Sequence, residues 1–374
     1  MKRKKFLKTT AKLGLGITTL ATALSSCKVE KKEVDLSAIN INFNKTFKWR
    51  MASFWPKNFP VFGEGDLFFI DWVKKMSGNR LDIKLYAKGE LVPAMEVFDT
   101  VQDGTADIGS AASYYWLGKT PAAAFFATAP FGMNAQQHHS WMVAGGGYEL
   151  WKEVYEPFGL IPFISGNSGV QMGGWFNKEI NTVDDLKGLK MRIPGIAGKA
   201  LEKAGGAAMN VPGGEIYTNL ERGVLDATEW VGPYHDYKMG FYKVAKYYYT
   251  PGWHEPGTQL EFFANKKAYE SLPSDLQEII QGAAVRVQSW TLAEFDAKNG
   301  IYLKKILDEG TELRRFPDDV LKALKKYSDE AIQEMIGNDL VAKKVADSYY
   351  SFKKRINPWT DITEKVYYNS IQEM

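Results

Sequence analysis

The sequence predicts an α/β fold made of two lobes of similar build, followed by long helices. Three observations support this prediction. Short apolar strands alternate with amphipathic helices between residues 47 and 111, and the same alternation returns between residues 160 and 231. From residue 273 onward the pattern changes to long helical segments. Alternating strands and helices are typical of a largely parallel sheet covered by helices.

The first lobe is expected over residues 46–164. Residues 81–86 alternate apolar and polar side chains, as a half-buried strand does. Apolar residues at helical spacing in 63–76 and 95–102 predict two helices, and Gly104 stops the second. The predicted strands of this lobe are 47–54, 81–86 and 106–111.

The second lobe is expected over residues 165–262 and repeats the rhythm of the first. An apolar-x-x-Gly-x-x-Asp-apolar frame occurs at 101–108 and again at 220–227, which favours two lobes of related build. In this second half of the chain, which begins with the last strand of the first lobe, strands are predicted at 160–164, 170–176, 191–193 and 227–231, with a helix at 198–204.

Residues 263–374 are expected to form helices that brace the lobes. Their apolar residues recur at helical spacing, with Lys and Glu on the other face. The predicted helices are 274–298, 300–308, 317–337 and 340–355.

The N-terminus has the features of an export signal. Six basic residues precede an uncharged apolar run at 13–24, which is shorter than the roughly 20 residues of a spanning helix. We therefore predict a signal peptide over 1–26. Cys27, the chain's single cysteine, stands where bacterial lipoproteins carry their acylated residue. Residues 27–45 would then be a lipid-anchored tether; the alternative is a cysteine without function in a discarded leader.

Charge gives no indication of nucleic-acid binding. The formal net charge is +3, and removal of the six basic leader residues leaves −3. The predicted mature chain therefore lacks the basic footprint of a nucleic-acid-binding protein.

Motifs of common enzyme classes are incomplete in this sequence. Gly118-Lys119-Thr120 lacks the first glycine of a phosphate-binding loop, and Val170 stands where the closing glycine of a hydrolase elbow belongs. His254-Glu255 is followed by proline, which excludes the helix of a zinc-protease motif. With four histidines in the chain, we expect ordinary structural histidines.

Residues 184–195, Asp-Asp-Leu-Lys-Gly-Leu-Lys-Met-Arg-Ile-Pro-Gly, resemble the signature of the solute-binding proteins of tripartite ATP-independent periplasmic (TRAP) transporters. Segments 102–107, 220–230 and 272–277 agree with the same family. Segments 171–176 and 252–257 further resemble its branch that binds 2-oxo or 2-hydroxy monocarboxylates together with a metal ion. The resemblance implies a two-lobed periplasmic binding protein, type II-like, with the ligand cleft between the lobes.

The same resemblance implies that an arginine on a strand of the second lobe pairs with the substrate carboxylate, and Arg192 occupies that place. A guanidinium fork can meet both carboxylate oxygens. The alternative is a surface arginine paired with Asp184 or Asp185.

A cation site is also implied, with Gln171, Glu229, Glu255 and the main-chain carbonyl of Trp230 at the matching positions. Oxygen ligands suit Na⁺ or Ca²⁺ rather than zinc. The alternative is that Glu229 and Glu255 pair with Arg or Lys.

Further contacts to the substrate are expected from Tyr114 and Tyr115 in the first lobe and from Asn167 in the second, together with the side chain of Gln171. Aromatic residues at strand ends also commonly belong to the core, and this alternative stays open for the tyrosines.

The predicted function is therefore an extracytoplasmic, lipid-anchored solute-binding protein, not an enzyme, that delivers a pyruvate-like or lactate-like acid to membrane permease subunits. Two alternatives remain, a secreted metal-dependent enzyme acting on a small carboxylate and a surface adhesion or structural protein. The apolar C-terminal tail suggests a homodimer through the last helix, as in some relatives, or a tail that packs back on its own lobes.

Overall fold

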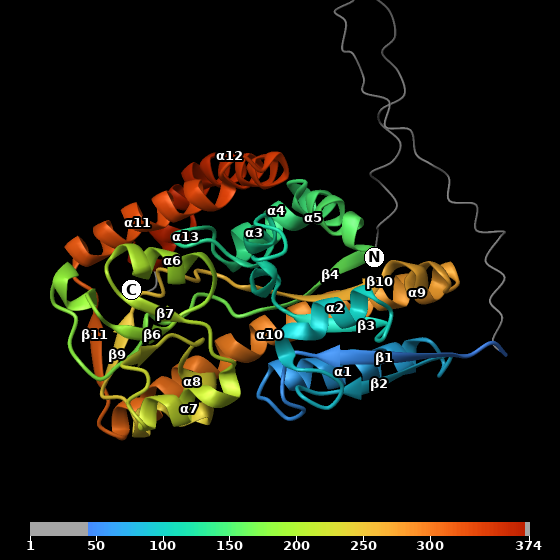
Figure 1. Cartoon of the computed structure of the whole chain (residues 1–374), viewed down its shortest axis with the longest axis horizontal. Coiled ribbons are helices and arrows are strands. Elements are labelled where there is room, and N and C mark those ends of the chain that lie inside the picture. Colours follow the sequence, from blue (N-terminus) through green and yellow to red (C-terminus); the bar gives the residue numbers. More distant parts are fainter. Residues whose placement is uncertain (1–43, 371–374) are drawn as a thin grey trace, which may run out of the picture. The chain divides into compact units, whose positions relative to one another are not determined.

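Two β-sheets organise residues 44–370, the part of the chain that the computed structural model describes (Figure 1). One sheet has the strand order β2-β1-β3-β10-β4 and the other β11-β9-β5-β8-β6-β7. Each sheet is the centre of one α/β lobe, so the predicted two-lobed α/β fold is confirmed.

In the first lobe β1 pairs in parallel with β2 and β3, while β10 runs antiparallel between β3 and β4. The strands are β1 (Phe47–Ser53), β2 (Leu81–Tyr86), β3 (Ile108–Ala111), β4 (Leu160–Asn167) and β10 (Gln259–Asn265). The helices are α1 (Phe62–Met76), α2 (Val97–Gln102), α3 (Ala123–Ala127), α4 (Ala135–Ala144), α5 (Gly147–Tyr155) and α9 (Lys266–Glu270), with 3₁₀ turns η2 (Ala94–Glu96), η3 (Ser113–Trp116) and η4 (Glu156–Phe158).

In the second lobe β6 is the centre of a parallel trio with β7 and β8, and β5 pairs antiparallel with β8 and β9. The strands are β5 (Gly174–Phe176), β6 (Lys190–Arg192), β7 (Ala207–Met209), β8 (Ala227–Thr228), β9 (Tyr247–Thr250) and β11 (Glu312–Arg315). The helices are α6 (Gly195–Lys203), α7 (Gly213–Glu221) and α8 (Pro233–Met239), with 3₁₀ turns η5 (Val183–Leu186) and η6 (Phe241–Lys243).

The sequence frame shared by the two lobes forms the same structure in each. Asp107 exchanges two hydrogen bonds with the backbone of Arg50 on β1, and Asp226 does the same with Lys190 on β6. The side chain of Arg50 also donates to the carbonyl of Gly104, and the side chain of Lys190 donates to the carbonyl of Gly223. Each of these glycines follows the helix that precedes the Asp. The repeated frame therefore joins a helix to a parallel strand in both lobes.

Long helices follow the two sheets. α10 (Ser274–Asp308) contacts β4 and α1 of the first lobe and α8 of the second. The prediction of two separate helices here is wrong, because Gly300 lies inside one continuous helix, where a glycine costs about 1 kcal/mol but does not break the hydrogen-bond ladder. The remaining helices are α11 (Asp318–Ile336), α12 (Leu340–Ile362) and α13 (Glu364–Ser370).

Two chain segments cross between the lobes side by side, one after β4 and one before β10. The amide of Ser168 donates to the carbonyl of Thr258, and the amide of Gln171 donates to the carbonyl of Glu255. The return crossing ends earlier than the predicted boundary at residue 262, because β10 begins at Gln259 and pairs in the first sheet. Within the predicted bracing region 263–374, β11 joins the second sheet.

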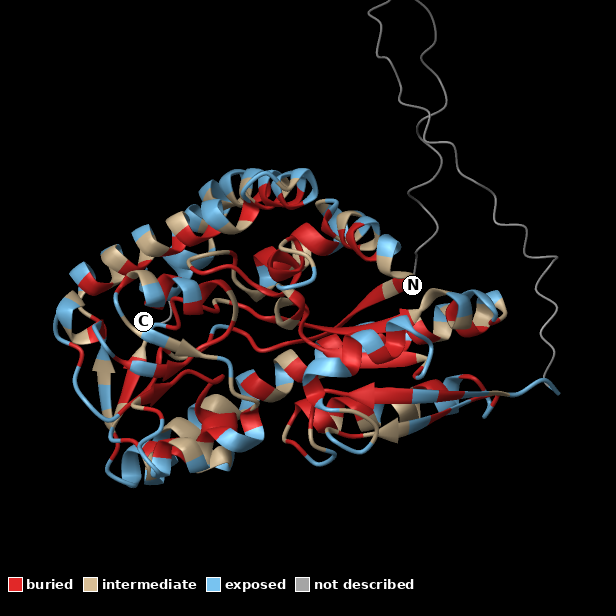
Figure 2. Cartoon of the chain, in the orientation of Figure 1, coloured by how far each residue is buried: buried red, intermediate tan, exposed pale blue. Residues whose placement is uncertain are grey.

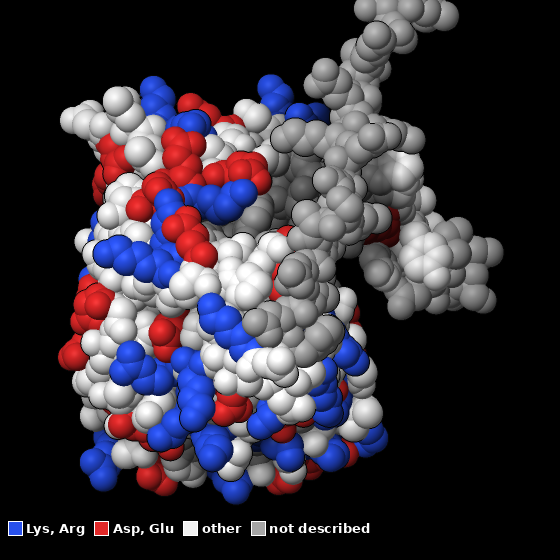
Figure 3. All heavy atoms as spheres, turned by 90° about the vertical axis from the view of Figure 1, so that its right-hand side faces the viewer, with Lys and Arg blue, Asp and Glu red and all other residues white. Residues whose placement is uncertain are grey.

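Residues are buried along most of the strands and on the inner faces of the helices, while the outer faces of α10 to α12 are exposed (Figure 2). On the face drawn in Figure 3, both signs of charge are present, with Asp and Glu gathered in the upper part and Lys and Arg more frequent below. No helix among residues 44–370 is long and apolar enough to cross a membrane. The predicted signal peptide, Cys27 and nearly all of the tether lie outside the described residues.

Candidate functional site

The second lobe supplies two charged residues at adjacent strand ends. Arg192 is the last residue of β6, and Glu229 directly follows β8, which pairs in parallel with β6. The amide of Glu229 donates to the carbonyl of Arg192 at 3.2 Å. Ligands of open α/β sheets gather at the carboxyl ends of parallel strands, and these two residues lie at that edge.

The guanidinium of Arg192 is buried and contacts three groups. Nε donates to the carbonyl of Val211 at 3.1 Å, Nη1 pairs with Glu229 Oε1, and Nη2 lies 3.4 Å from the hydroxyl of Tyr115. Burial is the largest single influence and works to lower the pKa of Arg192, but Glu229 together with Tyr115, Tyr114 and Glu255 raises the pKa above its ordinary value. The arginine therefore stays charged inside the protein.

Glu229, His254 and Glu255 form a buried cluster whose potential ligand atoms all lie within 4.8 Å of one another. His254 Nε2 is 3.1 Å from Glu229 Oε2, so Glu229 bridges Arg192 and His254. Burial, and then repulsion by Glu229, raises the pKa of Glu255 to about 7. Two close carboxylates in a site of low polarity favour the binding of a positive charge.

The two crossing segments add a polar cluster beside Glu255. Gln171 Nε2 donates to Glu255 Oε2 at 2.7 Å and to the hydroxyl of Ser168 at 3.0 Å, and Thr258 donates its hydroxyl to the same oxygen of Glu255. Among the described residues, the side-chain oxygen Oε1 of Gln171 is buried without a hydrogen-bond partner. Such an atom is costly unless something occupies the space in front of it.

Glycine at position 252 allows the two crossing segments to lie this close. A Cβ there would stand 2.1 Å from the carbonyl oxygen of Gln171. The Gly252–Glu255 segment can therefore reach Gln171 only with a residue that has no side chain at this position.

Trp230 covers the second-lobe side of Arg192. Its ring centroid lies 4.9 Å from the guanidinium carbon, a cation–π contact. Gly213 makes room for this ring, because a Cβ at that position would come within 2.4 Å of it. The aromatic face shields the guanidinium from solvent.

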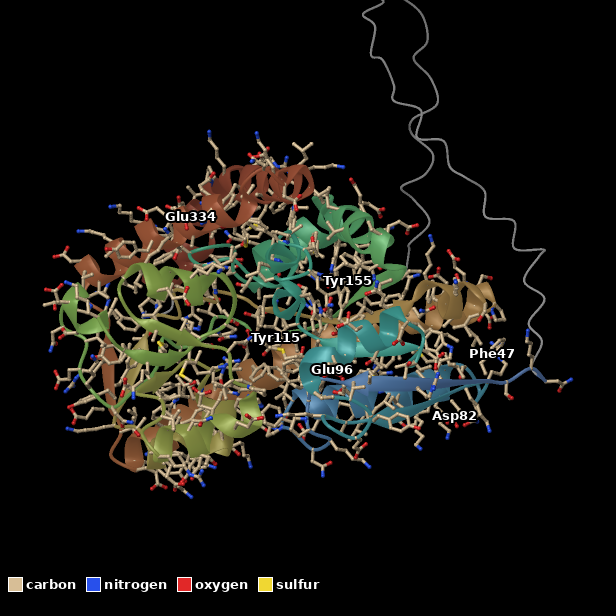
Figure 4. All side chains as sticks on the ribbon, in the orientation of Figure 1. Phe47, Asp82, Glu96, Tyr115, Tyr155 and Glu334 are labelled. Carbon is tan, nitrogen blue, oxygen red and sulfur yellow. The ribbon has the colours of Figure 1, made fainter. Side chains whose placement is uncertain are left out.

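The first lobe contributes an aromatic wall from η3. Figure 4 labels Tyr115, whose hydroxyl reaches Arg192 across the cleft. Burial raises the pKa of the Tyr115 phenol, which keeps it a neutral donor. A small cavity lies between the lobes, lined by polar and charged groups of Tyr114, Tyr115, Ser168, Gln171, Arg192 and Thr258 and by the apolar side chains of Trp55, Phe62, Trp230, Val231 and Leu260.

The structure thus places most of the predicted site residues together. Arg192 pairs with Glu229 and not with Asp184 or Asp185, which pair with Lys187 and with the Thr182 turn. The alternative that Glu229 pairs with an arginine or lysine, stated above, therefore also describes this structure, because Glu229 pairs with Arg192. Asn167 differs from the others: its side-chain oxygen accepts from the amide of Gly169 at 2.9 Å, and its amide nitrogen is buried without a partner among the described residues.

Three polar residues of the site were not predicted, namely Ser168, His254 and Thr258, and neither were the apolar wall residues Trp55, Phe62, Val231 and Leu260. His254 was interpreted as an ordinary histidine because Pro256, two residues later, excludes a helical metal motif, yet an irregular segment with several bends brings it to Glu229. The available signal was its position beside Glu255 in an apolar stretch. Ser168 and Thr258 became recognisable only when the two crossing segments were seen to pair.

Two α/β lobes joined by paired crossing segments, with a buried charged cluster facing the cleft, define the class of two-lobed solute-binding proteins. Comparisons with known proteins agree. The model of the bacterial extracellular solute-binding protein family 7 matches residues 51–339. A monocarboxylate 2-oxoacid-binding periplasmic protein of a Nostoc species is 41% identical over 99% of this chain and 98% of its own length.

Solved structures agree as well. A TRAP periplasmic solute-binding protein from Colwellia psychrerythraea, with bound calcium and pyruvate, is 43% identical over 87% of this chain and all of its own, with a TM-score of 0.85. A counterpart from Pseudoalteromonas atlantica holds sodium and pyruvate, with 43% identity, the same coverage and a TM-score of 0.84. The chain belongs to family 7 of the bacterial extracellular solute-binding proteins, the periplasmic receptors of TRAP transporters, and is not an enzyme.

Proposed function

We propose that this protein captures a small 2-oxo or 2-hydroxy monocarboxylate of the pyruvate class through Arg192 and a bound Na⁺ or Ca²⁺, and delivers it to TRAP permease subunits. The observation that carries the proposal is the buried cluster of Arg192, Glu229, Glu255 and Gln171, in which Gln171 Oε1 has no partner among the described residues. The ligands of the Nostoc, Colwellia and Pseudoalteromonas relatives support the same ligand class.

The charges of the cluster favour a cation. When both are ionised, Glu229 and Glu255 carry two negative charges against the one positive charge of Arg192, so an anionic substrate would enter a site that is already negative. The raised pKa of Glu255, caused by burial and then by repulsion from Glu229, reflects the cost of holding both charges without a cation. Na⁺ compensates one of the resulting charges and Ca²⁺ compensates two. Burial makes the repulsion between carboxylates larger than it would be in water.

The donor set fits a hard cation. Glu229, Glu255 and the side-chain oxygen of Gln171 would hold the ion, with the main-chain carbonyl of Trp230 as the fourth protein ligand. Oxygen ligands of this kind are those that Na⁺ and Ca²⁺ bind. When bound, the ion would stabilise the partial negative charge of the substrate's 2-oxo or 2-hydroxy oxygen, which is adjacent to its carboxylate.

The substrate carboxylate is assigned to Arg192. Of the five N–H groups of a guanidinium, three are engaged by described residues, which leaves two for a carboxylate. Tyr115 can donate from the first lobe, and Tyr114 lines the same cavity. The apolar walls of Trp55, Phe62 and Leu260 suit a short alkyl group at the other end of the acid.

Calorimetry on the mature protein tests the proposal. Pyruvate and lactate should bind in the presence of Ca²⁺ or Na⁺ and lose most of their affinity in a potassium buffer with chelator. Glu229→Gln should weaken cation and substrate binding together, whereas Asp66→Asn, a matched change of a buried carboxyl in the first lobe, should weaken neither. Tight pyruvate binding without either ion contradicts the cation assignment.

We also propose that Cys27 carries the lipid that anchors the mature protein outside the cytoplasm. The apolar run that ends just before this single cysteine supports the proposal. Cell fractionation of a Cys27→Ser variant tests it, because this variant should lose its membrane association or retain its leader. Membrane association together with a cleaved leader contradicts it.

A further inference from the structure

A histidine outside the ion and substrate ligands connects the two lobes. His235, on α8 of the second lobe, is fully buried, and its Nε2 lies 2.8 Å from the carbonyl oxygen of Pro60, in the loop before α1 of the first lobe. Its Nδ1 accepts a hydrogen bond from the indole N–H of Trp230. Because indole nitrogen only donates and a carbonyl only accepts, this pair of partners requires the tautomer with hydrogen on Nε2.

Aromatic side chains of the first lobe enclose this histidine. The rings of Phe59 and Phe62 each lie 4.9 Å from the imidazole centroid, and Phe59 also meets Trp230 edge-on at 5.8 Å. Both phenylalanines are buried. The contact therefore excludes water, which strengthens the hydrogen bond to Pro60.

The loop that provides this carbonyl has a strained backbone. Val61 has φ +59°, a left-handed conformation that a β-branched residue rarely adopts. Its amide donates to the carboxylate of Glu64 at 2.9 Å, and its side chain is completely buried. Strain of this kind persists only where surrounding contacts hold it, and His235 supplies such a contact from the opposite lobe.

The contact continues into the proposed substrate site. Trp230, which donates to His235, stacks on Arg192 and directly follows Glu229. A series of contacts therefore runs from the Pro60 loop through His235 and Trp230 to the guanidinium. Separation of the lobes would break the bond to Pro60 and remove the support behind the Trp230 ring.

We propose that His235 is a positioning residue that couples closure of the cleft to retention of the substrate, by bonding the Pro60 loop of one lobe to Trp230 of the other. The proposal rests on the proposed function. It assigns His235 no direct contact with substrate or cation. Its effect belongs to the closed state, so it should appear in the dissociation rate rather than in the association rate.

The test compares His235→Phe and His235→Gln with the control His138→Phe. His138 is also fully buried and bonds a carbonyl, but that carbonyl lies within its own lobe. Pyruvate is the probe, in saturating Ca²⁺. Stopped-flow tryptophan fluorescence gives the two rate constants, and small-angle scattering gives the compaction on binding. His235→Phe should dissociate pyruvate about tenfold faster, as expected for one lost hydrogen bond, with association changed less than about threefold.

His235→Gln, which can still donate and accept, should recover part of the slow dissociation, and His138→Phe should keep the wild-type rate. If His235→Phe does not fold, Phe59→Leu replaces it, since this change removes the ring packed on the imidazole while keeping an apolar side chain. A dissociation rate equal to that of the wild type in all His235 and Phe59 variants overturns the proposed positioning role of His235. Failure of the wild type to bind pyruvate overturns the proposed function instead.

Discussion

Arg192 and Glu229 form a buried ion pair, and breaking one partner of such a pair leaves an uncompensated charge. A substitution at Arg192 therefore tests both binding and folding. Lysine preserves the charge beside Glu229 but lacks the planar fork that meets two carboxylate oxygens. Alanine removes the charge, the fork and the stacking on Trp230 together.

We expect Arg192→Lys to fold and to bind pyruvate more weakly, and Arg192→Ala to lose binding altogether. Loss of a buried charged partner costs roughly 3 to 5 kcal/mol, or about two to four decades in affinity. Titration calorimetry measures the affinity, and the melting temperature without ligand separates a binding defect from unfolding. Near-wild-type affinity in a folded Arg192→Ala protein would show that the arginine does not bind the substrate.

The sequence could predict site residues whose roles follow from local motifs. Arg192, Gln171, Glu229 and Glu255 were predicted from family-like segments, and the structure brings all four together. His235 was not predicted, because its role depends on Pro60, a residue 175 positions away in the chain. Contacts of this kind are set by the closure of the lobes, which no local pattern records.

Among the secondary-structure elements, β10 carries a buried carboxyl group that the binding site does not use. Glu261 accepts from the indole of Trp116 at 2.6 Å and from the hydroxyl of Tyr155, labelled in Figure 4, at 2.7 Å. Burial raises the pKa of Glu261 from 4.5 to about 8. The folded protein therefore holds a proton that the unfolded chain releases above about pH 4.5.

This shift predicts a pH dependence of stability. The contribution of Glu261 is fully present below its unfolded pKa and is lost as pH rises through about 8. Between pH 7 and 8 it should remove on the order of 1 kcal/mol from the free energy of unfolding. Glu261→Gln, which keeps the shape without the charge, should flatten this slope in urea unfolding. An unchanged slope between pH 7 and 8 contradicts the assignment.

Element types were predictable where the hydrophobic period was regular. The strand at 81–86 matches β2 residue for residue, and the first helix differs from α1 by one residue at its start. β11 was missed because its residues, Glu-Leu-Arg-Arg, are mostly charged and lie at a sheet edge, where one neighbouring strand suffices. The helix ending predicted near Gly300 was wrong because packing along α10 outweighs the local cost of one glycine.

At the scale of the whole molecule, the crossing segments were the part that sequence patterns described least. Residues 168–173 and 251–258 are neither regular helix nor strand, yet they carry Gln171, Glu255 and Thr258. Because these side chains lie on the segments that join the lobes, we expect any movement of the lobes to change the spacing within the proposed cation site. β10 comes after the second lobe in the sequence but pairs in the first sheet. A lobe boundary placed from sequence patterns cannot show that the chain returns in this way.

The C-terminal helices expose an apolar surface at the end of the described chain. Trp359 and Ile362 on α12 and Tyr367 and Tyr368 on α13 are each more than half exposed, whereas the earlier turns of α12 pack on the first lobe through Tyr349 and Phe352. Apolar packing of α12 on the first lobe therefore ends before Trp359, and among the described residues the last side-chain hydrogen bond with that lobe runs from Gln137 to the hydroxyl of Thr360 at 2.9 Å. We propose that this exposed end contacts a second copy of the chain.

Light scattering of the mature protein should give the mass of a dimer. A protein truncated after Arg355 should give the mass of a monomer, because the truncation removes the exposed apolar residues and leaves Tyr349 and Phe352 in place. Trp359→Lys combined with Ile362→Lys is the matched test in the full-length chain, since charges introduced at an apolar contact oppose its desolvation. Pyruvate affinity should stay unchanged in both variants, because the site is built within one chain. A full-length protein that is monomeric at the highest soluble concentration contradicts the dimer and leaves this surface to another partner.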